Sequence, residues 1–342
     1  MSRVFITGSS TGLGLMAGRA LAEQGHQVVL HARDERRASD AMAVLSSGAD
    51  VVVGDASRLK DLYRMAEQLN GMGRFDAVIH NVGIGYREPR SILTEDGLPH
   101  VFAINVMAPY VLTALMNRPS RLIYLSSGMH RMVQANLDDI TWENRTWAGS
   151  TAYAESKLYD VLLAFAIARR CRDVFSNALE PGWVATRMGG SGAPDDIDQA
   201  HLTQAWLAAS NEPAALVTGH YFYHMHPRQP NPQAYDTTLQ TGWSVPASDY
   251  RVSNCRLEEK NHSCSAANVW LCATILQLTG SIGCEPDVGR TNPRPVRAVR
   301  PGGIELLLCR IRRQTSSQWE VPDPMSARGA LSRASLTHCK LN

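Results

Sequence analysis

The chain has 342 residues, with 34 Lys and Arg against 32 Asp and Glu, so its net charge is only +2. This length suffices for one α/β domain of ordinary size and a further segment. The first 240 residues carry no basic stretch interleaved with aromatic residues, so no nucleic-acid partner is expected. Their longest apolar run, 161–168, is too short to cross a bilayer, so no membrane partner is expected either.

A buried strand is predicted at the start of the chain, over 3–6, and a glycine-rich turn follows it at once. Gly8, Gly12 and Gly14 have the spacing G-x-x-x-G-x-G. Apolar residues then recur at helical spacing over 13–21. A strand, a turn and a helix start form a phosphate cradle, because backbone N–H groups and the helix dipole face the anion. The strand leaves no room for a signal peptide, so we expect a cytoplasmic protein.

A second buried strand, 27–31, completes a βαβ unit. An acidic residue near this strand end binds a ribose 2′-hydroxyl, whereas an arginine accommodates a 2′-phosphate. No acid lies at the strand tip, Arg33 is placed to pair with a phosphate, and Asp34 is expected beyond the turn. The pattern predicts NADP, with NADPH preferred over NADH; the alternative is a solvated turn.

Strands and helices continue to alternate further along the chain. The predicted elements are a helix over 59–69, a strand over 76–79, a helix over 105–116, a strand over 121–125, a helix over 153–165, a helix over 197–209 and a strand over 220–223. This alternation predicts an α/β fold with a doubly wound parallel sheet of Rossmann type and helices on both faces. Ligands of such sheets bind at the carboxyl ends of the strands.

Tyr153 and Lys157 are the most informative pair, because they lie four residues apart at the start of an apolar-periodic helix. Residues at this spacing share one helix face, about 5–6 Å apart at Cβ. An ammonium beside a phenol stabilises the phenolate, so the tyrosine can donate and accept a proton near neutral pH. The same spacing is common by chance, and its meaning depends on its neighbours.

These motifs, in this order, resemble the short-chain dehydrogenase/reductase family over about residues 3–235. The family's adenine-contacting acid matches Asp55. Its Asn-Asn-Ala-Gly motif is present as 80–83, with two of four positions retained, and its Pro-Gly loop after the sixth strand as 181–186. The cofactor-binding residues that the resemblance implies are Thr7, Gly8, Ser9, Ser10, Thr11, Gly12, Leu13, Gly14, Arg33, Asp55, Ala56, Asn81, Gly83, Tyr153, Lys157, Pro181, Gly182, Val184 and Thr186.

The family's catalytic set is matched as well. Asn105 corresponds to its asparagine, and Ser127, the second serine of the pair after the fifth strand, to its serine; Tyr153 and Lys157 complete the set. The gap between Ser127 and Tyr153 is longer than the family's commonest spacing. It resembles retinol-dehydrogenase-like members, which often read Ser-Ser-x-x-His, as this chain does up to His130.

The resemblance implies hydride transfer between a nicotinamide and the carbonyl or alcohol group of a small substrate. Tyr153 would exchange a proton with the substrate oxygen, which Ser127 would hydrogen-bond. Lys157 would support the phenolate and bind the nicotinamide ribose, and Asn105 would orient a water beside it. Each residue also has a plain structural interpretation, as a turn cap, a surface residue or a kink filler. No metal is implied, and a homodimer is compatible with the family.

The substrate is expected to be hydrophobic. The segment 188–198 is rich in Gly, Pro and Asp and lies where the family carries a lid. Apolar candidates for the pocket wall, which ordinary core packing explains equally well, are Tyr86, Met129, His130, Trp183 and Met188.

The leading interpretation of the function is an alcohol dehydrogenase or carbonyl reductase, and the alternative is a non-catalytic NADP(H)-binding regulatory protein. A nucleotide-sugar epimerase or dehydratase is disfavoured, because its G-x-x-G-x-x-G motif is absent.

The chain changes character near residue 240. Six of the seven cysteines lie beyond it, and from 241 on there are 13 Lys and Arg against 8 Asp and Glu. One apolar helix over 268–278 and one strand over 304–308 are conceivable, but no period is sustained. A disulfide or metal module, a basic tail, and a frame-shifted or intron-derived segment are the three interpretations, and we favour the last. We therefore expect a catalytic domain over 1–240 and a poorly ordered extension over 241–342.

Overall fold

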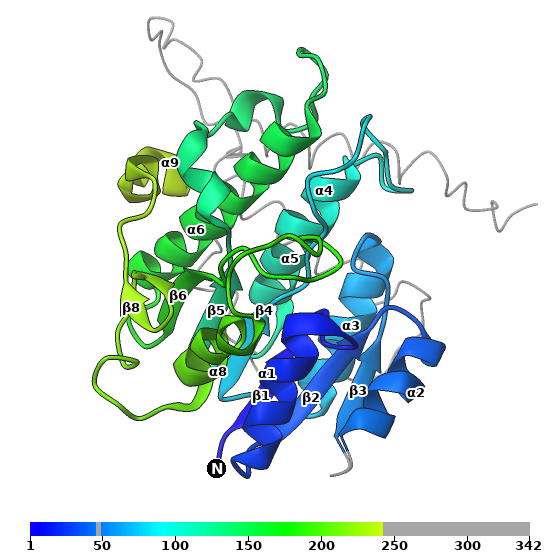
Figure 1. Cartoon of the computed structure of the whole chain (residues 1–342), viewed down its shortest axis with the longest axis vertical. Helices are drawn as coiled ribbons and strands as arrows, with labels where there is room; N and C mark the ends of the chain where they lie inside the picture. The colour runs from blue at the N-terminus through cyan, green and yellow to red at the C-terminus, as the bar shows by residue number, and fades with distance from the viewer. Residues whose placement is uncertain (46–48, 242–342) are drawn as a thin grey trace, which may run out of the picture.

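The computed structural model describes residues 1–45 and 49–241, and the following statements concern these residues. They form one sheet with the strand order β3-β2-β1-β4-β5-β6-β7-β8, in which β8 alone is antiparallel to its neighbour. Figure 1 shows this sheet between helices. The predicted doubly wound α/β fold is therefore confirmed. The elements expected over 268–278 and 304–308 lie outside the described residues, so the division near 240 stays a prediction.

The parallel strands end at one edge of the sheet, where the predicted motifs follow them. The strands are β1 (Arg3–Ile6), β2 (Gln27–Ala32), β3 (Asp50–Val53), β4 (Ala77–His80), β5 (Arg121–Leu125), β6 (Phe175–Glu180), β7 (Tyr221–Tyr223) and β8 (His226–Pro227). The predicted bounds agree with those of β1, β2, β4, β5 and β7 to within a residue, because each of these strands is a short, mostly apolar run. For β3 and β6, only the motifs that follow them were predicted. The short β8 carries a proline and has no apolar run, so the sequence did not indicate it.

The helices cover both faces of the sheet. They are α1 (Gly12–Glu23), α2 (Glu35–Val44), α3 (Leu59–Gly71), α4 (His100–Phe102), α5 (Ala108–Leu115), α6 (Gly149–Arg170), α7 (Ile197–Ala200), α8 (Leu202–Ala209) and α9 (Thr237–Thr241). The helix predicted over 197–209 is divided at His201 into α7 and α8. The sequence did not predict α2, because only Ala38 and Ala41 on this polar helix are buried.

Two apolar layers hold the sheet. One lies between the sheet and α3, α5 and α6, and the other between the sheet and α1 and α8. None of the described helices is long and apolar enough to cross a membrane.

The helix that carries Tyr153 and Lys157 is enclosed by the rest of the chain. Every residue of α6 from 152 to 167 is buried. Residues 235–240 close its outer side: the rings of Phe165 and Tyr235 lie 5.3 Å apart, and Arg169 donates to the Gln240 side chain at 2.9 Å. Figure 1 shows α9 beside α6. The position of this helix is thus fixed by packing on all sides.

Candidate active site

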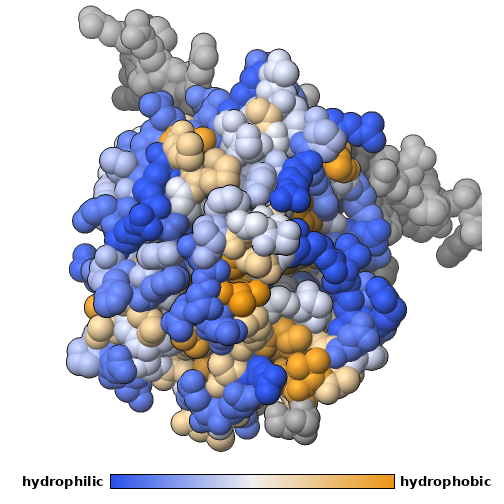
Figure 2. All heavy atoms as spheres, in the orientation of Figure 1, coloured by the Kyte–Doolittle hydropathy of each residue, from blue (hydrophilic) through white to orange (hydrophobic). Residues whose placement is uncertain are grey.

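A cleft of about 1330 Å³ runs along the carboxyl ends of β1, β4, β5 and β6. Figure 2 shows apolar side chains gathered in the middle of the face that carries α1, α8 and the segment between β6 and α7. The predicted residues that line the cleft are Gly8, Thr11, Gly12, Leu13, Asn81, Gly83, Ser127, Tyr153, Lys157, Pro181, Gly182, Val184 and Thr186. Those that lie outside its wall are Thr7, Ser9, Ser10, Gly14, Arg33, Asp55, Ala56 and Asn105.

The glycine-rich turn needs its glycines for two different reasons. Gly8 and Gly12 have φ values of +62° and +61°, a region that side chains disfavour. A Cβ on Gly14 would instead collide with the Asn81 amide and lie 2.8 Å from the Gly8 carbonyl oxygen. The Asn81 side chain donates to the carbonyl oxygens of Thr7 and Gly8, each at 3.0 Å. The turn is therefore held against the end of β4, with its backbone facing the cleft.

His31, which the sequence did not single out, fixes the turn from the other side. Its Nδ1 accepts the Gly8 N–H at 2.8 Å, so its Nε2 carries the hydrogen and donates to the Gly54 carbonyl oxygen at 2.8 Å. Burial lowers the pKa of His31, against the opposing effects of the Gly54 bond and the Asp55 carboxylate. The neutral imidazole thus links the glycine-rich turn to the segment after β3.

Two arginines follow β2, and the structure separates them. Arg37 lines the cleft, whereas the Arg33 side chain is 61% exposed and lies outside the cleft wall. Asp34 caps α2 by accepting the Arg37 N–H at 2.9 Å, so it does lie beyond the turn, as expected. Among the described residues, the buried Nε of Arg37 has no hydrogen-bond partner, although it lies 3.6 Å from the Asp34 carboxylate. Arg37 was not predicted from the sequence.

Asp55 lies behind this end of the cleft. Burial would raise the pKa of its carboxyl, but the Ser57 N–H and hydroxyl both donate to it, and Arg33 and Arg58 lie nearby; together they lower that pKa. The Asp55 carboxylate is therefore ionised, and Ser57 fixes its orientation.

Tyr153 and Lys157 lie one turn apart on α6, as predicted, and both line the cleft. The Tyr153 ring packs edge-on against Tyr86 at 5.8 Å, and its hydroxyl lies 3.8 Å from the Met188 sulfur. The Lys157 ammonium donates to the Leu125 carbonyl oxygen at 2.8 Å and to the Asp160 carboxylate at 2.9 Å. The lysine is thus anchored at the end of β5 with one N–H left over.

The two serines after β5 have different surroundings. The Ser126 hydroxyl is buried and donates to the Lys157 carbonyl oxygen at 2.7 Å. The Ser127 hydroxyl lines the cleft and accepts the Met129 N–H at 3.3 Å, which leaves its own hydrogen free to donate. Ser127 therefore does cap the turn, and it is also the better candidate for contact with a substrate.

Asn105 lies in a π-helical turn, Ala103–Met107, directly before α5. Such turns are rare and often occur at functional sites. Its amide exchanges hydrogen bonds with the Ile84 backbone at 2.8 and 3.1 Å and donates to the Ser156 hydroxyl at 3.0 Å. A Cβ built on Gly83 would lie 3.5 Å from the Asn105 oxygen and 3.6 Å from the Lys157 nitrogen. Asn105 thus connects the end of β4 with α6 behind the cleft.

His130 does not line the cleft, which corrects the expectation that it belongs to the pocket wall. It is fully buried; its Nδ1 donates to the Ser127 carbonyl oxygen at 2.6 Å, and its Nε2 accepts the Asn231 N–H at 3.0 Å. Burial lowers its pKa to about 4, so the ring is neutral. His130 therefore joins the backbone of the candidate serine to a residue a hundred positions later. The other predicted wall residues, Tyr86, Met129, Trp183 and Met188, all line the cleft.

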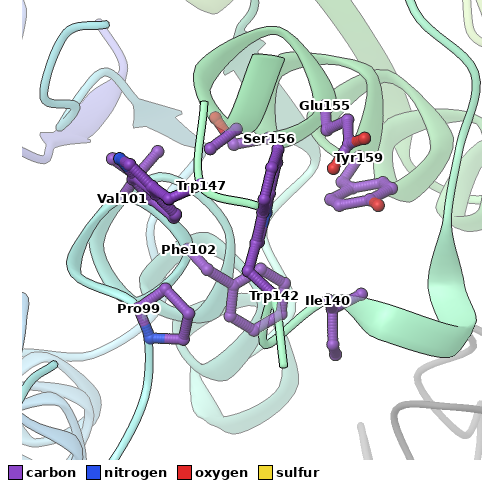
Figure 3. A pocket seen from close by; sticks show the side chains of 10 residues that line it. Pro99, Val101, Phe102, Ile140, Trp142, Trp147, Glu155, Ser156 and Tyr159 are labelled. Atoms are coloured by element: carbon purple, nitrogen blue, oxygen red, sulfur yellow. The ribbon is translucent and has the colours of Figure 1, made fainter. Parts of the chain in front are cut away.

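The segment between Ser127 and Tyr153 is anchored to α6 by an arginine. Arg145 makes two hydrogen bonds to the buried Glu155 carboxylate, at 2.6 and 2.7 Å, and its guanidinium stacks on Trp142 at 3.7 Å. Figure 3 shows Trp142 beside Glu155 and Tyr159 of α6, around a small cavity of about 10 Å³. The part of this segment around Trp142 and Arg145 therefore supports the helix, whereas its first residues, Met129 among them, line the cleft.

A charged group closes the opposite end of the cleft. The Glu180 carboxylate accepts hydrogen bonds from Arg131 and Arg228, each at 2.9 Å. Glu180 and Arg228 line the cleft, and neither was predicted. Within the described residues, no group of three or more His, Cys, Asp or Glu side chains could hold a metal ion.

Comparison with known proteins agrees with this geometry. Residues 2–196 match the family model described as short chain dehydrogenase. The chain is 41% identical over 244 residues to an uncharacterized oxidoreductase of Emericella nidulans, covering 70% of this chain and 93% of that protein. It is 38% identical to the short-chain dehydrogenase chyC of Penicillium rubens, covering 65% of this chain and 86% of that protein.

More distant similarities extend this result. Human retinol dehydrogenase 13 is 30% identical over 265 residues, which cover 68% of this chain and 79% of that protein. A crystal structure of an uncharacterized protein from Mycobacterium paratuberculosis has a TM-score of 0.61 at 25% identity, and covers 70% of this chain and 89% of that one.

Proposed function

The chain belongs to the short-chain dehydrogenase family and is an oxidoreductase, and from this premise we propose that it uses NADP to interconvert a carbonyl and an alcohol. The observation that carries the proposal is the convergence of Ser127, Tyr153 and Lys157 on one cleft with the glycine-rich turn. The substrate is a small molecule. The nicotinamide supplies or accepts the hydride when it is bound.

The residues present suit a dinucleotide. The turn that contains Gly8 and Gly12 presents backbone to the cleft at the start of α1, where an anion is favoured. Pro181 and Gly182, with Val184 and Thr186, line the cleft beyond Lys157 and would hold the nicotinamide half. The cleft, at about 1330 Å³, has room for a substrate beside the nucleotide.

A preference for NADP rests on the cations after β2. Arg37 lines the cleft with an unbonded Nε, and Arg33 lies nearby on the surface. A guanidinium pairs well with a phosphate, and no acid is placed to hold a 2′-hydroxyl at this strand end. We propose that Arg37 binds the 2′-phosphate of NADP directly and that the nearby positive charge of Arg33 adds to the attraction.

The proton is handled by the groups of α6. In reduction, the Tyr153 hydroxyl gives its proton to the carbonyl oxygen, and in oxidation it takes one from the alcohol. The Ser127 hydroxyl donates a hydrogen bond to the same oxygen and stabilises the charge that develops there. Lys157 stabilises the phenolate, and its remaining N–H would bind the nucleotide ribose. Asn105 holds the backbone beside Lys157, from which a water chain would return the proton to solvent.

The walls favour a hydrophobic, and often aromatic, substrate. Tyr86, Met129, Trp183 and Met188 line the cleft, and Tyr86 and Met188 contact Tyr153. Arg228 and Glu180 also line the cleft and would contact a polar substituent. A cytoplasmic location and a homodimer remain predictions. The buried faces of α6 are not available for dimer contacts, so a homodimer would use other surfaces.

Turnover with NADPH tests the proposal against a non-catalytic NADP(H)-binding protein. The probes are 4-nitrobenzaldehyde, 4-nitroacetophenone and cyclohexanone, each with NADPH and NADH. We expect NADPH oxidation with at least one probe and a loss of at least a hundredfold in kcat for Tyr153→Phe, in a variant that still binds NADPH. Binding without turnover of any probe would favour the regulatory alternative. Wild-type turnover by Tyr153→Phe would instead show an enzyme in which Tyr153 is not the proton donor.

A further inference from the structure

The Lys157 ammonium has a buried counter-ion that the catalytic set does not include. Asp160, three residues further along α6, accepts its hydrogen bond at 2.9 Å, and both side chains are about 95% or more buried. Asp160 lies outside the cleft wall, so it does not meet a substrate. It acts through the lysine alone.

The carboxylate is an unfavourable choice for this position if its role is packing. Its second oxygen, Oδ1, is buried with no hydrogen-bond partner among the described residues. An uncompensated buried oxygen costs roughly 1–3 kcal/mol, and a buried ion pair is often no more stable than apolar side chains of the same volume. The residues around it on α6, from 161 to 164, are all apolar. Replacing Asp160 alone would leave the buried Lys157 ammonium without its counter-ion, so the charge itself is what Asp160 contributes.

Tyr124, which interacts electrostatically with Asp160, is uncharged, and so are the titratable groups beside Tyr124. Burial raises the pKa of Tyr124 on β5 far above its ordinary value and raises that of the Cys171 thiol. Burial also lowers the pKa of His80 on β4, which stacks on Tyr124, to about 3. Within residues 1–45 and 49–241, Lys157 is therefore the charged partner that balances Asp160.

We infer that Asp160 is a positioning residue that holds the Lys157 ammonium and offsets part of its charge, so that Tyr153 keeps its proton at neutral pH. The inference rests on the proposed function. A lysine alone would stabilise the phenolate more strongly, because an opposite charge at close range favours the ionised form. With the carboxylate beside it, the pair favours the protonated tyrosine, which is the form that reduces a carbonyl. Asp160 thus biases the site toward reduction.

The test is the pH dependence of NADPH-driven reduction of 4-nitrobenzaldehyde by the full chain. Because reduction needs protonated Tyr153, activity falls on the alkaline side of the profile. In Asp160→Asn this alkaline limb is expected to move about one pH unit lower. Asp160→Glu, which keeps the charge, is expected to retain the wild-type limb. An unmoved limb, or a limb moved to higher pH, would assign Asp160 to packing and overturn the inference.

A readout without turnover keeps the inference separate from the proposed function. The absorbance of phenolate at 295 nm, taken as the difference between each form and its Tyr153→Phe partner, follows the ionisation of Tyr153 alone. The midpoint is expected to be about one pH unit lower in the Asp160→Asn background. If no carbonyl is reduced but this midpoint moves, the proposed function fails and the role of Asp160 stands. If turnover is normal and the midpoint does not move, the proposed function stands and the role inferred for Asp160 is wrong.

Folding is controlled with a second uncharged variant. Asp160→Leu removes both buried oxygens and is expected to give the same limb as Asp160→Asn, with a lower Tm because the Lys157 ammonium loses its counter-ion. If neither uncharged variant folds, the carboxylate serves stability and the inference is wrong.

Discussion

The sulfur of Met188 lies 3.8 Å from the hydroxyl of Tyr153, and the two side chains come from segments 35 residues apart. Met188 is held there closely: a Cβ on Gly85, across the cleft, would lie 2.7 Å from its Cγ. A flexible thioether thus occupies the space above the candidate proton donor, where a substrate oxygen must arrive.

We expect Met188→Ala to widen the site without weakening nucleotide binding. The kcat/KM for 4-nitroacetophenone is expected to rise about tenfold relative to that for 4-nitrobenzaldehyde, because one removed apolar group changes discrimination by roughly 1–3 kcal/mol. Steady-state kinetics with saturating NADPH measure this ratio. Met42→Ala, on the polar helix α2 outside the cleft, is the matched control. An unchanged ratio would show that Met188 does not limit substrate size.

Gly14 and Gly71 make a matched pair of glycine substitutions in helices. The Cβ of Gly14→Ala would meet the Gly8 carbonyl oxygen and the Asn81 side chain, so the glycine-rich turn must shift. A Cβ on Gly71 meets nothing within 4 Å. We expect Gly14→Ala to weaken NADPH binding at least tenfold and to destabilise the fold by about 1–3 kcal/mol. Gly71→Ala should be neutral or stabilising.

Fluorescence titration with NADPH and urea denaturation measure the two effects. Equal affinity in Gly14→Ala and Gly71→Ala would mean that this turn does not bind the nucleotide.

Substitution of Arg37 should weaken the binding of NADPH and leave the binding of NADH unchanged. The loss of a guanidinium–phosphate contact typically costs about 1.5–3 kcal/mol, so Arg37→Gln is expected to weaken NADPH binding by about tenfold or more. NADH binding should stay within a factor of two. Arg36→Gln, an exposed neighbour on the same helix, serves as control, and Arg33→Gln should have a smaller effect than Arg37→Gln. Equal losses for both nucleotides would place Arg37 elsewhere in the site.

His80 should make the fold sensitive to acid. It is fully buried, its Nε2 bonds the Thr113 hydroxyl at 3.0 Å, and burial lowers its pKa to about 3. The unfolded chain therefore binds a proton near pH 6.5 that the folded chain does not. The stability that His80 confers is complete above pH 6.5 and is lost as the pH falls from 6.5 toward 3, by up to about 1.4 kcal/mol per pH unit.

The measurement is the free energy of unfolding by urea between pH 7 and pH 4. His80→Asn should reduce its slope with pH by about one proton, whereas substitution of the exposed His220 by Asn should leave the slope unchanged. A slope that does not respond to His80→Asn contradicts the assignment.

Local patterns in the sequence were enough to predict the parts of the site that one element supplies. Tyr153 and Lys157 share a helix face by spacing alone, and the turn after β1 is recognisable from its glycines. The contacts that hold these parts were not predictable, because they join distant segments. His31 on β2 contacts Gly8 after β1, and His130 contacts Asn231, 101 residues later. A lone histidine gives no signal of its partner, which is why His130 was expected in the pocket wall.

Two of the missed residues did leave a local trace. Asp160 interrupts the apolar run of α6 three positions after Lys157, a spacing that brings the two side chains together on a helix. Arg37 follows the cap residue Asp34 by three positions and so lies in the first turn of α2. Both signals were readable from spacing, but only the structure distinguishes Arg37, which lines the cleft, from the neighbouring Arg33.

The enclosure of α6 has a consequence for the order in which the protein is made. Synthesis proceeds from the amino terminus, and the residues that close the outer side of α6, Tyr235 and Gln240, are among the last described ones to leave the ribosome. Until then the helix that carries the proton donor has an uncovered apolar flank. A nascent chain arrested before residue 230 should therefore bind chaperones through that flank, although every predicted catalytic residue has already been translated.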